Sequence, residues 1–529
     1  MIDDFENEIR EEIQEESTSD KFKIKEFYHP SLKQDENILC MSTSKKYIYL
    51  VSKGSELLLI DSTSLRPIKE KYRIPSAETN KTFNENITKI WSDRCGNHNI
   101  FRYRHAIYYF NPNFPEVKEL KNFTNKEICA VSFDDRNNDT KSTNNFLVSD
   151  YYNNIYECNI VIENNEGSKE FTIKDNIEKL TQLLDIENEE EDEFNEQYKK
   201  ISERIYGIKF VRAIKDKNKD NEDACFIVAV TKNRFYQFVG PDISSFKRLF
   251  QRYNLNPSLF NSSCKYFPSN YNINDSKLTD INILYKKKEK SSDNGNSSDN
   301  ELLNQFGWKT DSGYCFGQFN YDRKGSYAIP YEQKNFTVIP FSRITSQGEK
   351  GHKQEPIDIT HTHNHIFILY KDCLTVISKL TSYIIHTLYF RTSYDHIIYN
   401  EFSKDNEILL LTSANGLYQI SLKDENIDIW KDYLEVGDFD KAKVFCGSQK
   451  MVKRINRIIA EKFFEEKNGF SAITNFALSD ESFENVCLKY LMNDSYEELK
   501  IYLEYYKDSN LYEEKEKEKE KGKEKEKDK

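Results

Sequence analysis

The sequence has no hydrophobic segment that could serve as a membrane span or a secretory leader. No run of apolar residues in its 529 residues approaches the ~20 that a spanning helix needs. Residues 1–19 are acidic and lack the apolar stretch of a signal peptide. We therefore expect a cytoplasmic protein, whose membrane association, if it has one, comes through partners or lipid headgroups.

The sequence also lacks the motifs of metal sites and of common enzymes. None of its 10 cysteines belongs to a C-x-x-C pair, so we expect no zinc ribbon, RING finger or thioredoxin-type site. Nucleophile-elbow, P-loop, H-E-x-x-H and dinucleotide-binding motifs do not occur either. We predict that the protein is not an enzyme and needs no cofactor.

Positive charge is sparse and scattered. The formal net charge is -12, and the basic runs are short, as at Lys286–Lys288. Binding to nucleic-acid phosphates needs a concentrated basic face, so we expect no nucleic-acid partner. Mean hydropathy is low, at -0.78, yet aromatic residues make up 14% of the chain. This combination indicates ordered, aromatic-rich strands interrupted by polar insertions.

Short apolar, β-branched and aromatic runs separated by turns recur along the first four fifths of the chain. The clearest example is ACFIVAVTKNRFYQFVG, at residues 224–240. We recognise seven such units, at residues 40–65, 87–112, 128–163, 205–240, 313–341, 357–390 and 396–422. Because one small sheet cannot bury both of its faces, the units must stack and close radially, which predicts a β-propeller of about seven blades.

After residue 427 the apolar period changes from 2 to 3.6. Short amphipathic segments with tight polar turns follow one another, and this pattern is typical of the antiparallel helix pairs of an α-solenoid. We expect the second and third pairs to start at Asp438 and at Ser479 or Asp480, because these side chains cap helices well. The predicted fold class is therefore a β-propeller followed by the start of an α-solenoid.

The predicted domains differ in composition. An insertion at residues 164–199 is expected to form a short helix followed by a solvated acidic loop, and residues 270–300 are of low complexity. The predicted parts are an acidic disordered N-terminus (1–21), a propeller (22–425) with disordered insertions near 164–199 and 270–300, a solenoid start (427–512) and a Glu/Lys-rich tail (513–529).

The first helical segments carry the candidate interaction residues. These are Trp430, Tyr433, Leu434, Phe439 and Ala442. They could form a groove for a partner, or a seam where the first helices dock on the propeller and on each other. Their spacing favours the seam.

A second candidate is the histidine cluster at His361, His363 and His365. At period two the three imidazoles would project from one face of a strand, where they could bind zinc or copper in a metal-dependent enzyme. No carboxylate or cysteine pair accompanies them, so we favour a polar strand edge or turn.

Four segments resemble one known family. DIWKDYLEVGDFDKAKVFC (428–446), residues 459–491, residues 203–240 and GWKTDSGYCFGQFNY (307–321) are similar, in order and spacing, to the Pep3/deep orange family of vacuolar protein sorting-associated 18 subunits. That family continues into a long solenoid and a RING-type zinc domain. This sequence instead reaches a Glu/Lys tract. If the chain ends there, we expect it to bind core partners weakly or only through the propeller and the first helix pairs; the alternative is that the tract is an insertion inside a longer solenoid and the sequence is a fragment.

The resemblance implies a function. Members belong to the class C core of the HOPS and CORVET complexes, which tether endosomal, lysosomal or vacuolar membranes and assist SNARE-driven fusion. We therefore expect a non-enzymatic scaffold whose partners are other class C subunits, with SNAREs and Rab GTPases bound directly or through the complex. It would lie peripherally on late endosomes, lysosomes or the vacuole. The alternative is a coat- or nucleoporin-like propeller–solenoid scaffold.

Overall fold

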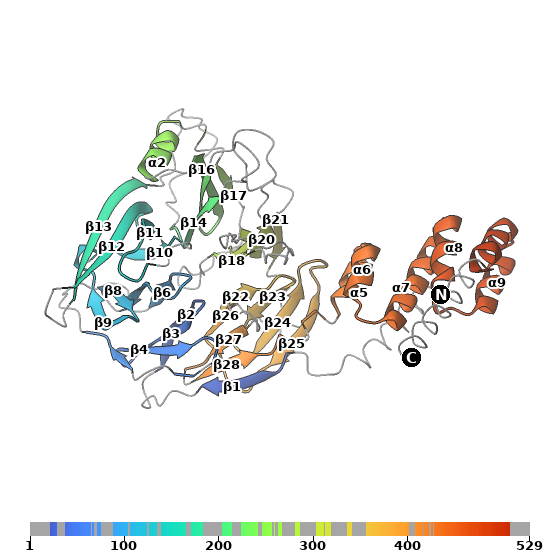
Figure 1. Cartoon of the computed structure of the whole chain (residues 1–529), viewed down its shortest axis with the longest axis horizontal. Coiled ribbons are helices and arrows are strands. Elements are labelled where there is room, and N and C mark those ends of the chain that lie inside the picture. The colour runs from blue at the N-terminus through green and yellow to red at the C-terminus, as the bar shows by residue number, and fades with distance from the viewer. Residues whose placement is uncertain are drawn as a thin grey trace, which may run out of the picture. The chain divides into compact units, whose positions relative to one another are not determined.

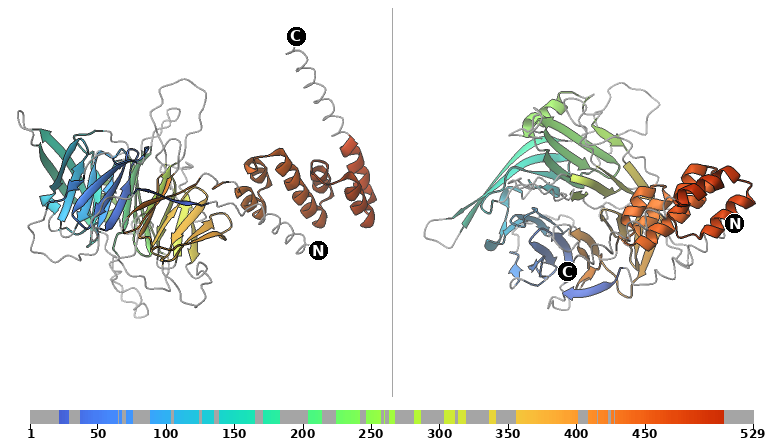
Figure 2. Two further views of the ribbon diagram at one scale, coloured as in Figure 1. Left: turned by 90° about the horizontal axis from the view of Figure 1, so that it is seen from below. Right: turned by 45° about the vertical axis from the view of Figure 1, so that its right-hand side comes forward.

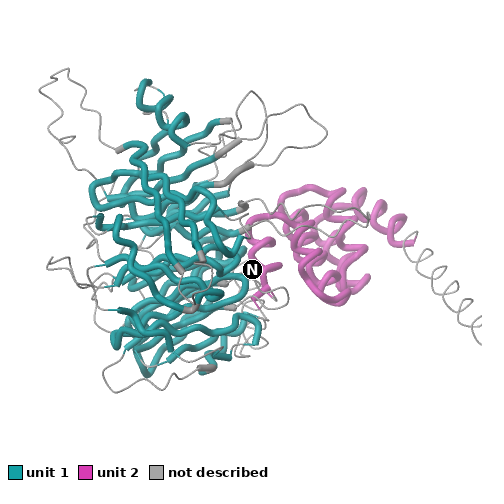
Figure 3. The backbone as a smooth tube through the Cα atoms, turned by 60° about the vertical axis from the view of Figure 1, so that its left-hand side comes forward, with its two compact units in different colours: residues 1–422 teal, residues 423–529 magenta. Residues whose placement is uncertain are grey.

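The computed structural model describes most of residues 22–507 (Figure 1). The longer segments outside the description are 1–21, 29–36, 76–87, 183–203, 214–223, 267–280, 286–302, 319–335, 341–355, 401–407 and 508–529, and the remaining gaps are of one to six residues. The chain divides into two compact units, residues 1–422 and residues 423–529 (Figure 3).

Within its described residues, the first unit contains seven four-stranded antiparallel sheets arranged in a ring (Figure 1). We call the sheets blades. Blade 1 contains β2 (Ile38–Thr43), β3 (Tyr47–Ser52), β4 (Glu56–Asp61) and β5 (Tyr72–Arg73). Blade 2 contains β6 (Lys89–Ser92), β7 (Asn99–Tyr103), β8 (Ala106–Asn111) and β9 (Phe114–Glu119). Blade 3 contains β10 (Ile128–Ser132), β11 (Phe146–Asp150), β12 (Asn154–Asn164) and β13 (Phe171–Gln182).

The other four blades complete the ring. Blade 4 contains β14 (Gly207–Ala213), β15 (Ala224–Val230), β16 (Arg234–Pro241) and β17 (Cys264–Tyr266). Blade 5 contains β18 (Asn282–Tyr285), β19 (Leu303–Lys309), β20 (Gly313–Gln318) and β21 (Phe336–Pro340). Blade 6 contains β22 (Asp358–His361), β23 (His365–Leu369), β24 (Cys373–Ser378) and β25 (Ile384–Tyr389). Blade 7 contains β26 (His396–Asn400), β27 (Ile408–Thr412), β28 (Leu417–Ile420) and β1 (Ile24–Tyr28).

The hydrophobic core of the first unit lies between the blades, whose stacking Figure 2 shows from two further sides. Its described residues form seven apolar clusters, one for each pair of neighbouring blades, including the pair formed by blades 7 and 1. In β3, Tyr49 and Val51 belong to the cluster shared with blade 2, whereas Ile48 and Leu50 belong to the cluster shared with blade 7. Middle strands are therefore apolar on both faces, which explains their unbroken hydrophobic runs.

The ring is closed by strands from both ends of the unit. Strand β1 is the outer strand of blade 7 and pairs with β28, in the register Ile24↔Ile420 and Lys25↔Gln419. Just before β1, the Phe22 ring packs edge-on against Phe367 of blade 6, with the ring centroids 5.7 Å apart. Phe22 is 2% exposed and belongs to the cluster between blades 6 and 7. The sequence predicted strands in the unit at 396–422, but neither β1 nor this closure was predicted.

A histidine joins three blades at the same place in the ring. The Nδ1 atom of His396 lies 3.7 Å from a carboxylate oxygen of Asp358 in blade 6, and its Nε2 atom lies 3.0 Å from the Leu39 carbonyl oxygen in blade 1. Burial lowers the pKa of His396, but the Asp358 carboxylate and the Leu39 carbonyl outweigh that effect and leave the pKa above its ordinary value.

Two of the predicted insertions contain strands, so those predictions were wrong in part. Residues 171–182 of the insertion at 164–199 form β13, and Asn282–Tyr285 of the insertion at 270–300 forms β18. In β13, Ile173 and Ile177 pack on the cluster between blades 2 and 3, and the antiparallel pairing with β12 shows that this segment is a strand. The predicted acidic loop lies outside the described residues, at 183–203.

Two shorter elements accompany the blades, η1 (Lys121–Phe123) and α2 (Phe246–Asn254). Helix α2 was not predicted. Its buried residues Phe246, Leu249, Phe250 and Tyr253 pack into the cluster between blades 3 and 4. They follow helical spacing, so this pattern was the signal that the sequence analysis missed.

The described part of the second unit is helical. Its helices are α5 (Ile429–Glu435), α6 (Phe439–Phe445), α7 (Gln449–Glu465), α8 (Gly469–Ala477), α9 (Phe483–Met492) and a last helix at residues 496–507. Helix α5 contacts α6, and α7 contacts α8. Tyr490 of α9 and Tyr502 of the last helix share one apolar cluster with α7 and α8. The predicted succession of helix pairs is confirmed.

Asp438 caps a helix as predicted, but this helix pairs with α5 and so does not begin the second pair, and the other predicted start is wrong. Asp438 is the N-cap of α6, and its side chain accepts a hydrogen bond from the Lys441 backbone N–H. Helix α9 is capped by Ser482, and not by Ser479 or Asp480. The Ser479 hydroxyl instead donates to the Phe476 carbonyl oxygen at the end of α8, which keeps it in the preceding turn.

Phe22 provides a test of ring closure. We expect Phe22→Ala to lower the free energy of unfolding of the first unit by about 3–5 kcal/mol, because it removes a buried ring between blades 6 and 7. Urea unfolding followed by the fluorescence of Trp91 and Trp308 measures this effect. The exposed Lys25→Ala is the matched control and should change stability by less than about 0.5 kcal/mol. Equal stability of the two variants would contradict closure by this segment.

Candidate interaction surfaces

All five residues singled out in the sequence lie on α5 and α6, on either side of one tight turn. Gly437 has a φ of 80°, and this left-handed conformation suits glycine at a helix end. The Gly437 N–H donates to the Leu434 carbonyl oxygen over 3.1 Å, and the Asp438 N–H donates to that of Tyr433 over 2.8 Å. These bonds end α5 and turn the chain back into α6.

The structure places the five residues mainly in contacts among the first three helices. The Tyr433 ring stacks on Phe445 of α6 with centroids 5.2 Å apart, and Phe439 meets Phe463 of α7 edge-on at 5.8 Å. Ala442 and Trp430 are buried, and Leu434 is half-buried. Docking of these residues on the propeller, or on a partner, stays a prediction.

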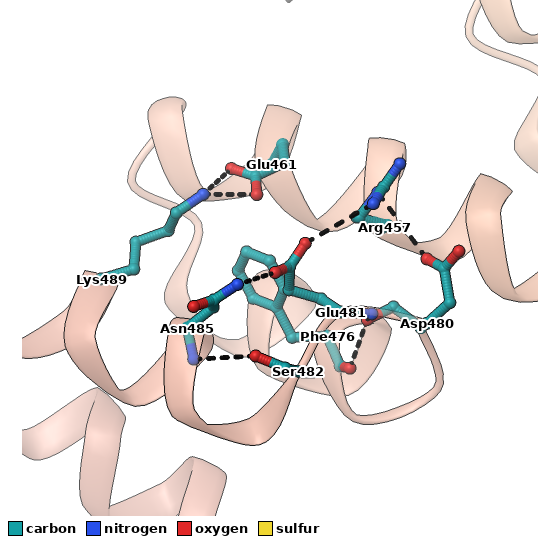
Figure 4. A network of polar contacts seen from close by, with 9 residues as sticks. Arg457, Glu461, Phe476, Asp480, Glu481, Ser482, Asn485 and Lys489 are labelled. Atoms are coloured by element: carbon teal, nitrogen blue, oxygen red, sulfur yellow. Dashed lines mark hydrogen bonds and ion pairs between the residues drawn. The ribbon is translucent and has the colours of Figure 1, made fainter. Parts of the chain in front are cut away.

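A polar network joins α7 to α9 and to the turn before it (Figure 4). Arg457 of α7 lies 3.7 Å from Asp480 and 3.8 Å from Glu481, and Glu461 pairs with Lys489 of α9. The Lys489 ammonium also lies over the ring of Phe476 at 5.5 Å. Because both partners of each pair are held inside the unit, we interpret this network as a structural one that fixes α9 on α7.

The last two helices expose an apolar surface that the sequence analysis did not identify. We call it the terminal apolar surface, and its exposed residues are Leu488, Leu491, Met492, Tyr496, Ile501, Leu503 and Tyr505. Met492 is 83% exposed. The opposite face of the same helices is buried through Val486, Tyr490 and Tyr502. Helix α9 is thus apolar on two faces, and only one of them is covered.

The three histidines do not lie along one strand face, so the geometry predicted for a metal site was wrong. His361 ends β22 and His365 begins β23, with His363 in the turn between them. The His361 Nδ1 atom lies 2.6 Å from the Tyr314 hydroxyl, and burial holds the pKa of His361 well below its ordinary value. The described residues contain no group of three or more histidine, cysteine or acidic side chains placed to hold a metal ion.

These features define a class of protein: a closed seven-bladed propeller followed by helix pairs with apolar surfaces. None of the helices in the described ranges is long and apolar enough to cross a membrane. The sequence model of the Pep3/Vps18/deep orange beta-propeller domain matches residues 21–426. The chain therefore belongs to the Pep3/Vps18/deep orange family, as the resemblance of its motifs predicted.

Individual relatives are distant. The chain is 23% identical over 292 residues to the vacuolar protein sorting-associated protein 18 homolog of Danio rerio. The aligned residues cover 53% of this chain and 27% of that protein. It is 22% identical over 291 residues to vacuolar sorting protein 18 of Arabidopsis thaliana, covering 53% and 26%. The aligned residues thus span about a quarter of the length of these curated relatives.

Solved structures with a similar arrangement include other propellers. The Cps50 (Swd1) beta-propeller domain of Myceliophteria thermophila matches with a TM-score of 0.41 and 9% identity, over 74% of this chain and 98% of that one. The WD40 domain of SCAP from fission yeast matches with a TM-score of 0.38 and 12% identity, over 76% and 99%.

Trp430 tests how the first helix is held. Trp430 is 5% exposed, so Trp430→Ala should cost about 3 kcal/mol or more and loosen the helical unit, while the propeller stays folded. Hydrogen exchange over α5 and α6 measures the first effect. The remaining tryptophans, Trp91 and Trp308, both lie in the propeller, and their fluorescence measures whether the propeller stays folded.

Lys450→Ala, an exposed change on α7, serves as the control for this experiment. If hydrogen exchange in α5 and α6 is the same in the two variants, Trp430 does not hold the helix, and the result favours the interpretation of these residues as a groove for a partner.

Proposed function

We propose that the protein is a non-enzymatic scaffold subunit of an endosomal or vacuolar membrane-tethering complex of the HOPS/CORVET type. The observation that carries this proposal is the family match over residues 21–426, which covers the whole propeller. The relatives from Danio rerio and Arabidopsis thaliana are named for vacuolar protein sorting, which supports the same pathway.

The geometry supports a mechanism built on surfaces. A closed propeller is rigid because each blade is buried between two others, so its rim can present binding groups at fixed positions. Helix pairs bury surface by stacking on further helices, and the terminal apolar surface offers such a face. Affinity would then come from interfaces of standard size, and the assembly would hold two membranes close enough for SNARE proteins to pair.

The proposed partners follow from the family. They are other class C tethering subunits, with SNAREs and Rab GTPases engaged directly or through the complex. The proposed location is the cytoplasmic face of late endosomes, lysosomes or the vacuole, where the protein would be peripheral and held by its partners.

The terminal apolar surface can be tested directly. We expect the double variant Leu488→Glu/Met492→Glu to reduce recovery of class C subunits with the affinity-purified chain at least about tenfold, because two carboxylates would have to be desolvated in the interface. Mass spectrometry of the co-purifying chains, scaled to the bait, is the measurement. Both replaced side chains are exposed, so the melting temperature should not change.

Lys453→Glu is the matched control, because it is exposed on α7 and changes the net charge by the same amount as the double variant. It should recover partners like the wild type. If the wild-type chain recovers no tethering subunits, the proposed function is wrong. If the double variant recovers them fully, the assembly contacts lie elsewhere on the chain.

A further inference from the structure

Strand β25 is the outer strand of blade 6, and no described strand pairs with its outer edge (Figure 1). In and beside this strand Tyr383, Ile384, Ile385 and Tyr389 are exposed, with Tyr389 at 72% and Tyr383 at 62%. The register pairs Ile384 with Ile377 and Tyr389 with Cys373, which places Ile384 and Tyr389 on the same face of the sheet. A bulge in the pairing with β24 lies between His386 and Ile384, and it adds Ile384 to the exposed set.

The other outer strands do not expose several apolar side chains: β17 exposes one ring, Tyr266, beside Lys265. Exposed charges occupy β1, β5, β9 and β13, for example in the Lys174–Glu163 pair at 2.7 Å. Strand β21 has no charge either, but its one exposed side chain is Thr337 and it ends in Pro340. Natural sheets use charges, prolines and short strands to stop edges from pairing with other chains. Strand β25, with the sequence IIHTLY, has no charge and no proline, and its bulge affects only its first residues.

The backbone of β25 is also available. The Phe390 N–H donates to the Asp372 carbonyl oxygen over 2.7 Å, and Cys373 pairs with Tyr389 and Thr375 with Thr387. In an antiparallel ladder the bonded residues alternate, so the N–H and C=O groups of Thr387 and Tyr389 point away from β24. These residues therefore offer main-chain groups and, at Tyr389, an exposed ring along one open edge.

The size and charge of this edge indicate what binds there. The exposed parts of its apolar side chains amount to roughly 500 Å², well below the ~800 Å² that each partner contributes to a stable folded interface. The exposed charges beside the edge balance, with Lys371 and Arg391 against Asp372 and Asp395, and the Lys379 ammonium is held by Gln305 and the Thr362 carbonyl. The area is too small for a second folded copy of the chain, and it suits a short apolar strand.

We infer that β25 is a docking edge for an extended linear segment of a partner protein, which adds to blade 6 as a fifth strand. Main-chain hydrogen bonds to Thr387 and Tyr389 supply the affinity, and apolar side chains on one face of the segment cover Ile384 and Tyr389. This site lies on the propeller and does not depend on the terminal apolar surface.

The edge can be blocked without disturbing the blade. Thr387→Pro removes an N–H that points away from β24, and proline is tolerated at such edge positions. Thr387→Val keeps the N–H and nearly the same shape, and so is the matched control. A second variant, Tyr389→Ser, removes the most exposed ring but keeps the backbone. Thermal unfolding of the full chain checks that all three variants fold like the wild type.

The probe is a phage-displayed library of random linear peptides, selected on the full-length chain. We expect selected peptides to share alternating apolar residues. They should bind wild type and Thr387→Val equally, and bind Thr387→Pro at least about tenfold more weakly. Tyr389→Ser should weaken binding as well. Bound peptide should slow the hydrogen exchange of the Thr387 and Tyr389 amides, which should be fast in the free chain.

Four results would overturn the inference. Selection could yield no peptide, or the peptides could bind Thr387→Pro as tightly as wild type. The Thr387 and Tyr389 amides could already be protected in the free chain, which would mean that the chain covers its own edge. Light scattering could show a dimer that Thr387→Pro abolishes, which would make a second copy the occupant.

Discussion

Everything in the first unit depends on one packing constraint: a four-stranded blade has two apolar faces and can bury neither of them alone. Seven blades bury all of their apolar faces only if the ring closes, because an open row would leave the outer faces of its two end blades exposed. The cluster of Ile48, Leu50 and Leu410 between blades 7 and 1 is the interface that an open row would lack. Closure rests on β1, which crosses from the N-terminal end of the unit to complete blade 7 beside β28.

This constraint also explains the unusual composition. Burial is confined to the clusters between blades, so the segments that connect the strands can be long, polar and rich in asparagine, lysine and glutamate without affecting the core. The low mean hydropathy and the high aromatic content of the chain are then compatible. Apolar side chains that remain exposed, as at Met492 and Tyr389, stand out against this polar background. For that reason we place function on surfaces and not in a pocket.

The sequence predicted the fold class, the number of blades and the helix pairs, because unbroken apolar runs and helical periods are local signals. The interpretation failed where the local signal was compatible with two structures. Ile173 and Ile177 are four residues apart, a spacing that fits one face of a strand and one face of a helix alike, and only pairing with β12 decides between the two structures. The role of β1 could not be predicted, because its partner β28 lies at the other end of the unit and nothing in either segment specifies the pair.

The candidate surfaces were the hardest part to predict. Trp430, Tyr433 and Phe439 are conspicuous in the sequence, and the structure places two of these rings against neighbouring aromatics of the helical unit. The exposed stripes on α9 and β25 follow the same apolar spacing as buried ones. Which stripe is covered depends on the neighbours that the fold supplies, and sequence periodicity does not report that.

Disulfide trapping across β1 and β28 tests the closure of the ring most directly. Lys25 and Gln419 are direct partners in the register, and Cα atoms of such pairs lie about 5.5 Å apart, within the range that a disulfide spans. In the Lys25→Cys/Gln419→Cys variant, mild oxidation of the folded chain should give one cross-linked peptide that joins positions 25 and 419. The account is contradicted if both introduced thiols stay free and are alkylated at the rate of an exposed cysteine.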